Sequence, residues 1–153
     1  MIAGNRLLGV DYGQVRVGLA VSDPDRKFAF PLTTHERQGP ERDATYFRAL
    51  VSQEDIGGLV VGLPVHLSGR EGQKAGEART FGAWLATATG LPVVYFDERF
   101  TTVLAEAALW DAGLTHKKRK ARRDKVAAQM FLQAYLDAGC PPEAPPGALD
   151  GGT

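Results

Sequence analysis

The spacing of apolar residues along the chain predicts five strands and four helices. Short apolar runs, most of them rich in β-branched residues, predict strands at 6–12, 15–22, 28–34, 59–62 and 92–96. Apolar residues at helical spacing predict helices at 40–54, 73–89, 101–112 and 118–138. Gly90 and Gly139 are expected to end two of these helices, and Gly57-Gly58 predicts a break before the fourth strand.

The order of these elements predicts an α/β fold with a mixed five-stranded sheet. Three strands joined by tight turns should be antiparallel, and the alternating strands and helices that follow should add parallel strands, with helices on both faces. Pro31 places the third strand near a sheet edge. We expect one domain over 1–138 and a flexible tail over 139–153, which is rich in Pro, Gly and Ala.

Composition narrows the setting in which the protein works. The chain of 153 residues has 18 basic and 18 acidic residues, so a nucleic-acid surface must be a local patch and not a global field. Cys140 is the single cysteine and cannot form an internal disulfide. Neither a membrane-spanning run nor the apolar segment of a signal peptide is present. We therefore expect a cytoplasmic protein that does not associate with membranes.

Asp11 is a carboxylate inside the apolar first strand. Strand alternation puts it on one face with Leu7 and Gly9, near the carboxyl end of the strand, where sites gather in sheets of this kind. A carboxylate in such a run is costly unless something compensates its charge. A turn-capping role at Tyr12-Gly13 is the alternative.

Two further segments carry carboxylates in similar surroundings. Asp97 and Glu98 directly follow the last predicted strand; we favour Glu98 for the site, although the spacing alone does not choose between them. An acidic pair at the surface, or an ion pair with Arg99, is the alternative. Asp124 shares a helical stripe with apolar residues that should face the core, whereas stabilisation of the helix N-terminus is its alternative role.

Three converging carboxylates would repel one another and take up protons unless a cation were shared between them. Mg²⁺ or Mn²⁺ binds oxygen ligands and leaves coordination positions for phosphate oxygens. Two such ions, about 3.5–4 Å apart, can stabilise the attacking and leaving oxygens of a phosphodiester. We therefore predict that Asp11, Glu98 and Asp124 are catalytic residues and metal ligands.

A dense basic segment surrounds Asp124. The segment runs from Thr115 to Lys125 and holds seven of the 18 basic residues of the chain. Within this segment, the predicted nucleic-acid-binding residues are Lys117, Lys118, Arg119, Lys120, Arg122 and Arg123. The density of charge favours binding to phosphates, and the lack of aromatic residues in the segment favours backbone contact over base stacking. A solvated helix face is the ordinary alternative.

Other groups give weaker signals. The loop after the fourth strand suggests a phosphate-binding loop at Gly62, Ser68, Gly69 and Arg70, although it lacks the P-loop pattern and a plain surface loop explains it equally well. The histidines have no metal-ligand spacing, so we expect His35 at the surface. Phe81 and Trp84 have helical spacing typical of core packing.

The assembled motifs resemble the YqgF family, also called RuvX, of ribonuclease-H-like nucleases. The matching segments, in order, are GVDYGQVRVGLAVSD, LVVGLPVHLSGREG, DERFTT and KKRKARRDKVAAQMFLQAYL. The resemblance implies a ribonuclease-H-like fold and places the acidic positions of the family on Asp11, Glu98 and Asp124. It also puts Arg16 on the family's basic position, which implies that Arg16 binds nucleic acid. Arg123 departs from the pattern, since members often carry an apolar residue there.

The resemblance implies a metal-dependent nuclease that trims the 5′ end of pre-16S rRNA or resolves Holliday junctions. We expect a structured RNA or branched DNA substrate and a monomer or homodimer. One alternative is a non-catalytic ribosome-assembly factor that binds nucleic acid through the basic helix. Another is actin-like nucleotide binding through the Asp11-Tyr12-Gly13 loop, although the chain is too short for the second domain that such proteins close around ATP.

Overall fold

The structure is a computed structural model that describes residues 4–63, 72–97 and 116–142, with only the backbone of 116–124. Its strands are β1 (Arg6–Asp11), β2 (Arg16–Ser22), β3 (Ala29–Glu36), β4 (Ile56–Leu63) and β5 (Val93–Asp97). Its helices are α1 (Pro40–Gln53), α2 (Gln73–Thr89) and α4 (His116–Asp137). The predicted helix at 101–112 and most of the predicted tail lie outside the described residues.

The strands form one mixed sheet in the order β3-β2-β1-β4-β5. β1 pairs antiparallel with β2 and parallel with β4; β2 pairs antiparallel with β3, and β4 pairs parallel with β5. The predicted mixed sheet is therefore confirmed, and β3, which contains Pro31, is an edge strand as expected. β1 is the central strand, so its carboxyl end lies between β2 of the antiparallel part of the sheet and β4 of the parallel part.

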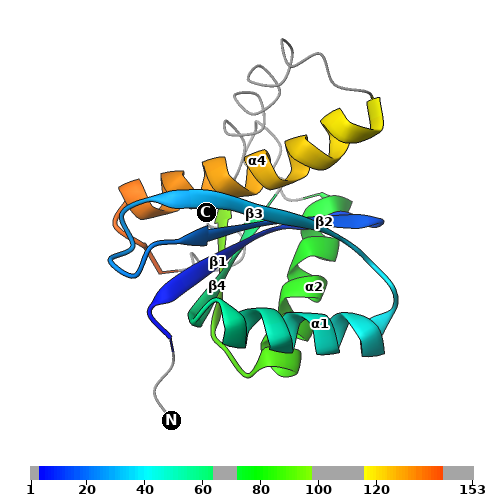
Figure 1. Cartoon of the computed structure of the whole chain (residues 1–153), viewed down its shortest axis with the longest axis horizontal. Helices are drawn as coiled ribbons and strands as arrows, with labels where there is room; N and C mark the ends of the chain where they lie inside the picture. Colours follow the sequence, from blue (N-terminus) through cyan, green and yellow to red (C-terminus); the bar gives the residue numbers. More distant parts are fainter. Residues whose placement is uncertain (1–3, 64–71, 98–115, 143–153) are drawn as a thin grey trace.

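Helices cover both faces of the sheet (Figure 1), as the element order predicted. Helices α1 and α2 cover one face, where Phe47, Phe81 and Leu85 pack against alternate residues of the strands. Helix α4 covers the opposite face, where Phe131, Leu132 and other residues of its buried stripe pack. Along the central strands, residues therefore alternate between a face that packs against α1 and α2 and a face that packs against α4.

Two glycines predicted to break the chain instead lie inside a strand, and this prediction was wrong. Gly57 and Gly58 belong to β4, which begins at Ile56. A Cβ on Gly57 would lie 1.7 Å from the carbonyl oxygen of Gly4, and one on Gly58 would lie 3.2 Å from Leu7 Cδ2. The glycines are needed because other parts of the chain approach closely, and sequence spacing alone does not distinguish this role from a turn.

The helix ends agree more closely with the sequence. Helix α2 has the predicted bounds and is capped by Gly90 in the left-handed conformation, with φ of 72°. Pro40 occupies the first turn of α1, where its missing N–H costs little. Gly139 follows α4 with φ of 88°, and the Cys140 N–H donates to the carbonyl of Tyr135. Local capping chemistry therefore fixes these ends.

Candidate functional site

Asp11 is the last residue of the central strand and is half-buried. It pairs with Gly18, and the preceding pair on the same face joins Gly9 to Ala20, which packs in the cluster beneath α4. Alternation therefore puts Asp11 on the α4 face, at the carboxyl edge of the sheet. The sequence assigned Asp11 to one face with Leu7 and Gly9, and the structure identifies that face as the one covered by α4.

Arg16 lies at the same edge and on the same face. It begins β2, two residues before Gly18, which is the pairing partner of Asp11. Alternation along β2 from Ala20 through Gly18 assigns Arg16 to the α4 face. The short β1–β2 turn thus brings Arg16, which the family resemblance marked, to the edge and face of Asp11.

Helix α4 approaches β1 closely at this face. A Cβ on Gly9 would lie 3.0 Å from Leu132 Cβ and 3.4 Å from the carbonyl oxygen of Ala128. The predicted buried stripe is confirmed, because Ala127, Ala128, Phe131 and Tyr135 are all buried. Position 124 precedes Ala128 by about one helical turn, and in Figure 1 the N-terminal end of α4 lies on the side where β1 ends.

Asp97 occupies the other face of the sheet. Its pairing partner is Leu63, which belongs to the cluster beneath α1 and α2, and Tyr95 packs against the same cluster. Phe96 packs instead in the α4 cluster, 5.4 Å from the ring of Tyr135. Strand alternation therefore separates Asp97 from the face of Asp11. Glu98, the favoured residue, lies outside the described residues.

The remaining predicted site residues are placed only in part. Gly62 is buried within β4 and pairs with Phe96, so it is part of the sheet and not of a loop. Ser68, Gly69 and Arg70 lie outside the described residues. Asp124 and the basic residues from Lys117 to Arg123 belong to α4, of which only the backbone is described there. Within the described residues no group of three His, Cys, Asp or Glu side chains could hold a metal ion.

Arg37 shapes this edge of the sheet, although no sequence pattern marked it. Its backbone N–H donates to the carbonyl of Val15, and its Nη1 lies 3.3 Å and 3.2 Å from the carbonyl oxygens of Gly13 and Gln14. The same nitrogen donates to the hydroxyl of Tyr12 at 3.2 Å. Arg37 therefore fixes the turn that joins Asp11 to Arg16.

His35 is packed inside the fold, which corrects the expectation of a surface residue. Its side chain is 9% exposed, and its Nε2 lies 2.8 Å from Asp43 Oδ1. Its ring stacks on Tyr46 with centroids 3.8 Å apart. His35 belongs to β3 and Asp43 to α1. Only the packing of these two elements brings the carboxylate to the imidazole ring, so residue spacing in the sequence did not indicate this contact.

Similarity to solved structures agrees with the arrangement of sheet and helices. The fold is similar to that of T. thermophilus RuvC in complex with a Holliday junction substrate, with a TM-score of 0.55 and 14% identity over 90% of this chain and 98% of that chain. It is also similar to the Fowlpox virus resolvase in complex with Holliday junction DNA, with a TM-score of 0.52 and 8% identity over 89% and 99% of the two chains. The protein therefore has a ribonuclease-H-like fold.

Sequence comparison defines the family within this class. The family model described as "RuvX: Holliday junction resolvase" matches residues 5–138, and the chain belongs to this family. A relative from Rhodopirellula baltica is 51% identical over 136 residues, which cover 89% of this chain and 79% of the relative. One from Chloroflexus aurantiacus is 42% identical over 132 residues, 86% of each chain. Both relatives bear the name "Putative pre-16S rRNA nuclease".

Proposed function

We propose that this protein is a divalent-metal-dependent nuclease that hydrolyses phosphodiester bonds in structured nucleic acid. Asp11, Glu98 and Asp124 are the proposed catalytic residues and metal ligands. The observation that carries the proposal is the position of Asp11 at the carboxyl end of the central strand, on the face that α4 covers. Membership of the RuvX family supports the same reaction class.

The chemistry of the donor set fits a hard divalent cation. Three carboxylates offer only oxygen ligands, which suit Mg²⁺ or Mn²⁺. When bound, such ions activate water and stabilise charge on phosphate oxygens. Asp11 comes from a rigid central strand, and a ligand held by a strand is positioned more precisely than one held by a loop.

The basic residues are proposed to hold the substrate backbone. Arg16 shares the edge and the face of Asp11, so its guanidinium is positioned for a phosphate near that carboxylate. The basic residues of α4 from Lys117 to Arg123 are proposed to bind further phosphates of the same substrate. Backbone contacts of this kind position a strand without reading its sequence.

The proposed substrate is the precursor of 16S rRNA, because the relatives are named putative pre-16S rRNA nucleases. The proposed site of cleavage, at the 5′ end, is what the resemblance to the family implies. Branched DNA is the second candidate substrate, since the family description and the two structural relatives refer to Holliday junctions.

A cytoplasmic location belongs to the same proposal. No helix among the described residues is long and apolar enough to cross a membrane.

A cleavage panel with purified protein tests the proposal. The panel offers single-stranded RNA, structured ribosomal precursor RNA and a four-way DNA junction, each with Mg²⁺, with Mn²⁺ and with EDTA. We expect metal-dependent cleavage of at least one substrate by the wild-type protein. Asp11→Asn should fold normally and reduce cleavage to background, because the amide carries no charge for the cation.

Asp25→Asn is the matched control, since it makes the same change at an exposed carboxylate in the β2–β3 turn. It should cleave like wild type. Wild-type turnover by Asp11→Asn would contradict the proposed mechanism. Tight binding of structured RNA without cleavage under any condition would favour the assembly factor, and micromolar ATP binding would favour the nucleotide-binding alternative.

A further inference from the structure

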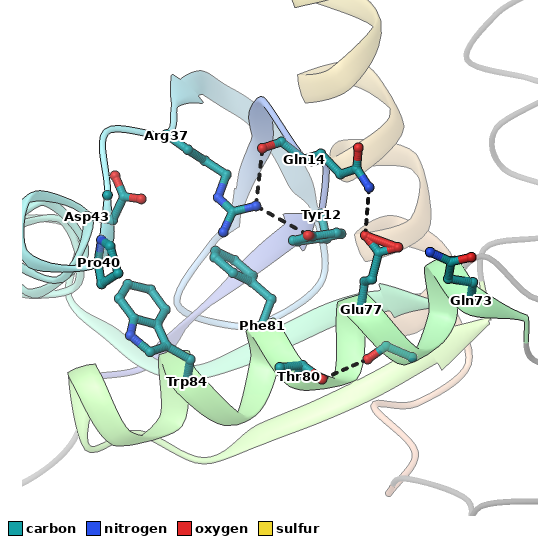
Figure 2. A pocket seen from close by; sticks show the side chains of 12 residues that line it. Tyr12, Gln14, Arg37, Pro40, Asp43, Gln73, Glu77, Thr80, Phe81 and Trp84 are labelled. Carbon is teal, nitrogen blue, oxygen red and sulfur yellow. Dashed lines mark hydrogen bonds between the residues drawn. The ribbon is translucent and has the colours of Figure 1, made fainter.

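A pocket of about 820 Å³ lies on the sheet face opposite Asp11 but at the same edge (Figure 2). It is bounded by Tyr12 and Gln14 after β1, by the segment from Arg37 to Pro40, and by helix α2. Tyr12 directly follows Asp11 in the chain. The volume of the pocket is in the range of pockets that bind small organic groups. A role of this pocket in substrate binding rests on the proposed nuclease function.

The floor of the pocket is aromatic. The ring of Tyr12 lies 5.1 Å from that of Phe81, and Phe81 stacks on Trp84 at 5.5 Å with an angle of 28° between the planes. Phe81 is buried, whereas Tyr12 and Trp84 are half-buried. The sequence assigned Phe81 and Trp84 to core packing, and the structure shows that both also line an open cavity.

Arg37 adds a planar cation to this floor. Its guanidinium carbon lies 5.3 Å from the ring centre of Tyr12 and 5.1 Å from that of Phe81. Figure 2 shows the guanidinium held toward Tyr12 by its hydrogen bonds. Nucleobases in protein complexes stack on aromatic rings and on arginine planes of this kind.

Hydrogen-bonding groups line the wall of the pocket formed by α2. Gln14 Nε2 donates to Glu77 Oε1 at 2.9 Å, and the Thr80 hydroxyl donates to the carbonyl of Gly76 at 3.0 Å. Gln73 completes this wall. Amide, carboxylate and hydroxyl groups can pair with the polar edge of a planar heterocycle.

The charge of the lining selects a base over a phosphate. Among the described residues that line the pocket, Arg37 is the only basic one, and Glu77 and Asp43 are acidic. Nη1 of Arg37 is already used by the turn carbonyls. A phosphate inside the pocket would meet two carboxylates, whereas a neutral base would not.

We propose that this pocket receives one unpaired nucleobase from the strand whose backbone passes the edge of the sheet at Asp11. The base stacks on the surface formed by Tyr12, Phe81, Trp84 and Arg37, and its polar edge meets Gln14, Glu77 and Thr80. The nuclease therefore prefers substrates with an unpaired base next to the site of backbone contact.

Gly76 allows a direct test, because a Cβ at this exposed position would meet nothing within 4 Å. Gly76→Leu therefore puts a bulky side chain into the pocket without a clash at its Cβ. Ala83→Leu is the matched control: it adds the same side chain at an exposed position of α2 outside the pocket lining. Circular dichroism and thermal unfolding serve to check that both variants fold.

The probes are a fluorescein-labelled 12-nucleotide oligo-dA strand and a strand of the same length with only abasic residues, with EDTA present, followed by fluorescence anisotropy. Wild type and Ala83→Leu should bind the oligo-dA strand about tenfold more tightly than the abasic strand, the size expected for one stacked base. Gly76→Leu should reduce this ratio to near one.

A Gly76→Leu variant that keeps the wild-type ratio would overturn the inference. Adenosine that binds as tightly as the oligo-dA strand would also overturn it, because the pocket would then serve a free small molecule. The proposed function fails differently: in that case the wild-type protein binds neither strand and cleaves none of the substrates in the panel.

Discussion

Gly9 of β1 and Leu132 of α4 are in such close contact that a Cβ added to Gly9 would lie 3.0 Å from Leu132 Cβ. The contact lies on the face of the sheet that also carries Asp11. Asp11 follows Gly9 by two residues along β1. A side chain at position 9 would move α4 away from the sheet. The absence of that side chain therefore sets the distance between the central strand and the helix that contains Asp124.

Gly9→Ala should reduce the free energy of unfolding by about 1–3 kcal/mol, the usual cost of an extra methyl group in a well-packed core. Leu132 Cβ is fixed to a helix backbone and cannot rotate away. Urea denaturation measures the change. Gly76→Ala is the control, since its new Cβ has open space and should stabilise α2 by about 0.5–1 kcal/mol. Equal effects of the two substitutions would contradict the packing argument.

Asp97 and Glu98 should differ sharply in their effect on cleavage. The Asp97 position pairs with Leu63 on the face covered by α1 and α2, away from Asp11. Asp97→Asn should therefore retain cleavage within a few-fold of wild type, whereas Glu98→Gln should lose it. Single-turnover cleavage of the best substrate in the panel measures both. If Asp97→Asn lost cleavage while Glu98→Gln kept it, Asp97 and not Glu98 would be the metal ligand.

Asp43→Ala should destabilise the fold by about 1–3 kcal/mol, because it removes a buried carboxylate and leaves two partly buried donors without an acceptor. Asp43 is 3% exposed, and its Oδ1 lies 2.8 Å from His35 Nε2 and accepts from the backbone N–H of Gln38 at 2.9 Å. Chemical denaturation measures the loss. Glu41→Ala removes an exposed carboxylate from the same first turn of α1 and should change stability by less than about 0.5 kcal/mol.

Acid should weaken the β2–β3 turn through Asp23. Hydrogen bonds from the backbone N–H groups of Phe28 and Lys27 lower the pKa of Asp23 below its ordinary value of 3.8. The unfolded chain therefore binds a proton more readily than the folded one. The stabilisation is present above pH 3.8 and is lost as the pH falls through the lowered pKa.

Asp23→Ala should consequently lose less of its stability than wild type when the pH falls from about 5 to about 2.5. Thermal unfolding midpoints at the two pH values measure the difference. Asp25→Ala, an exposed change in the same turn, should keep the wild-type pH dependence. An identical pH dependence of Asp23→Ala and wild type would show that these hydrogen bonds do not favour the ionised carboxylate.

Within the described residues, the sequence by itself determined the elements and most of their ends, because strand alternation, helical spacing and glycine caps are local properties of the chain. It assigned Asp11 to a face with Leu7 and Gly9, and it identified the buried stripe of α4. These predictions hold because burial imposes a period of two on a strand and of 3.6 on a helix.

Only the tertiary structure decided what each face meets. It put α4 over Asp11 and Arg16, it placed Asp97 on the other face through its pairing with Leu63, and it made Gly57 and Gly58 part of β4. It also gathered Tyr12, Arg37 and Trp84 around one pocket. Such contacts join residues far apart in the chain, and they depend on strand order and helix packing, which no local periodicity encodes.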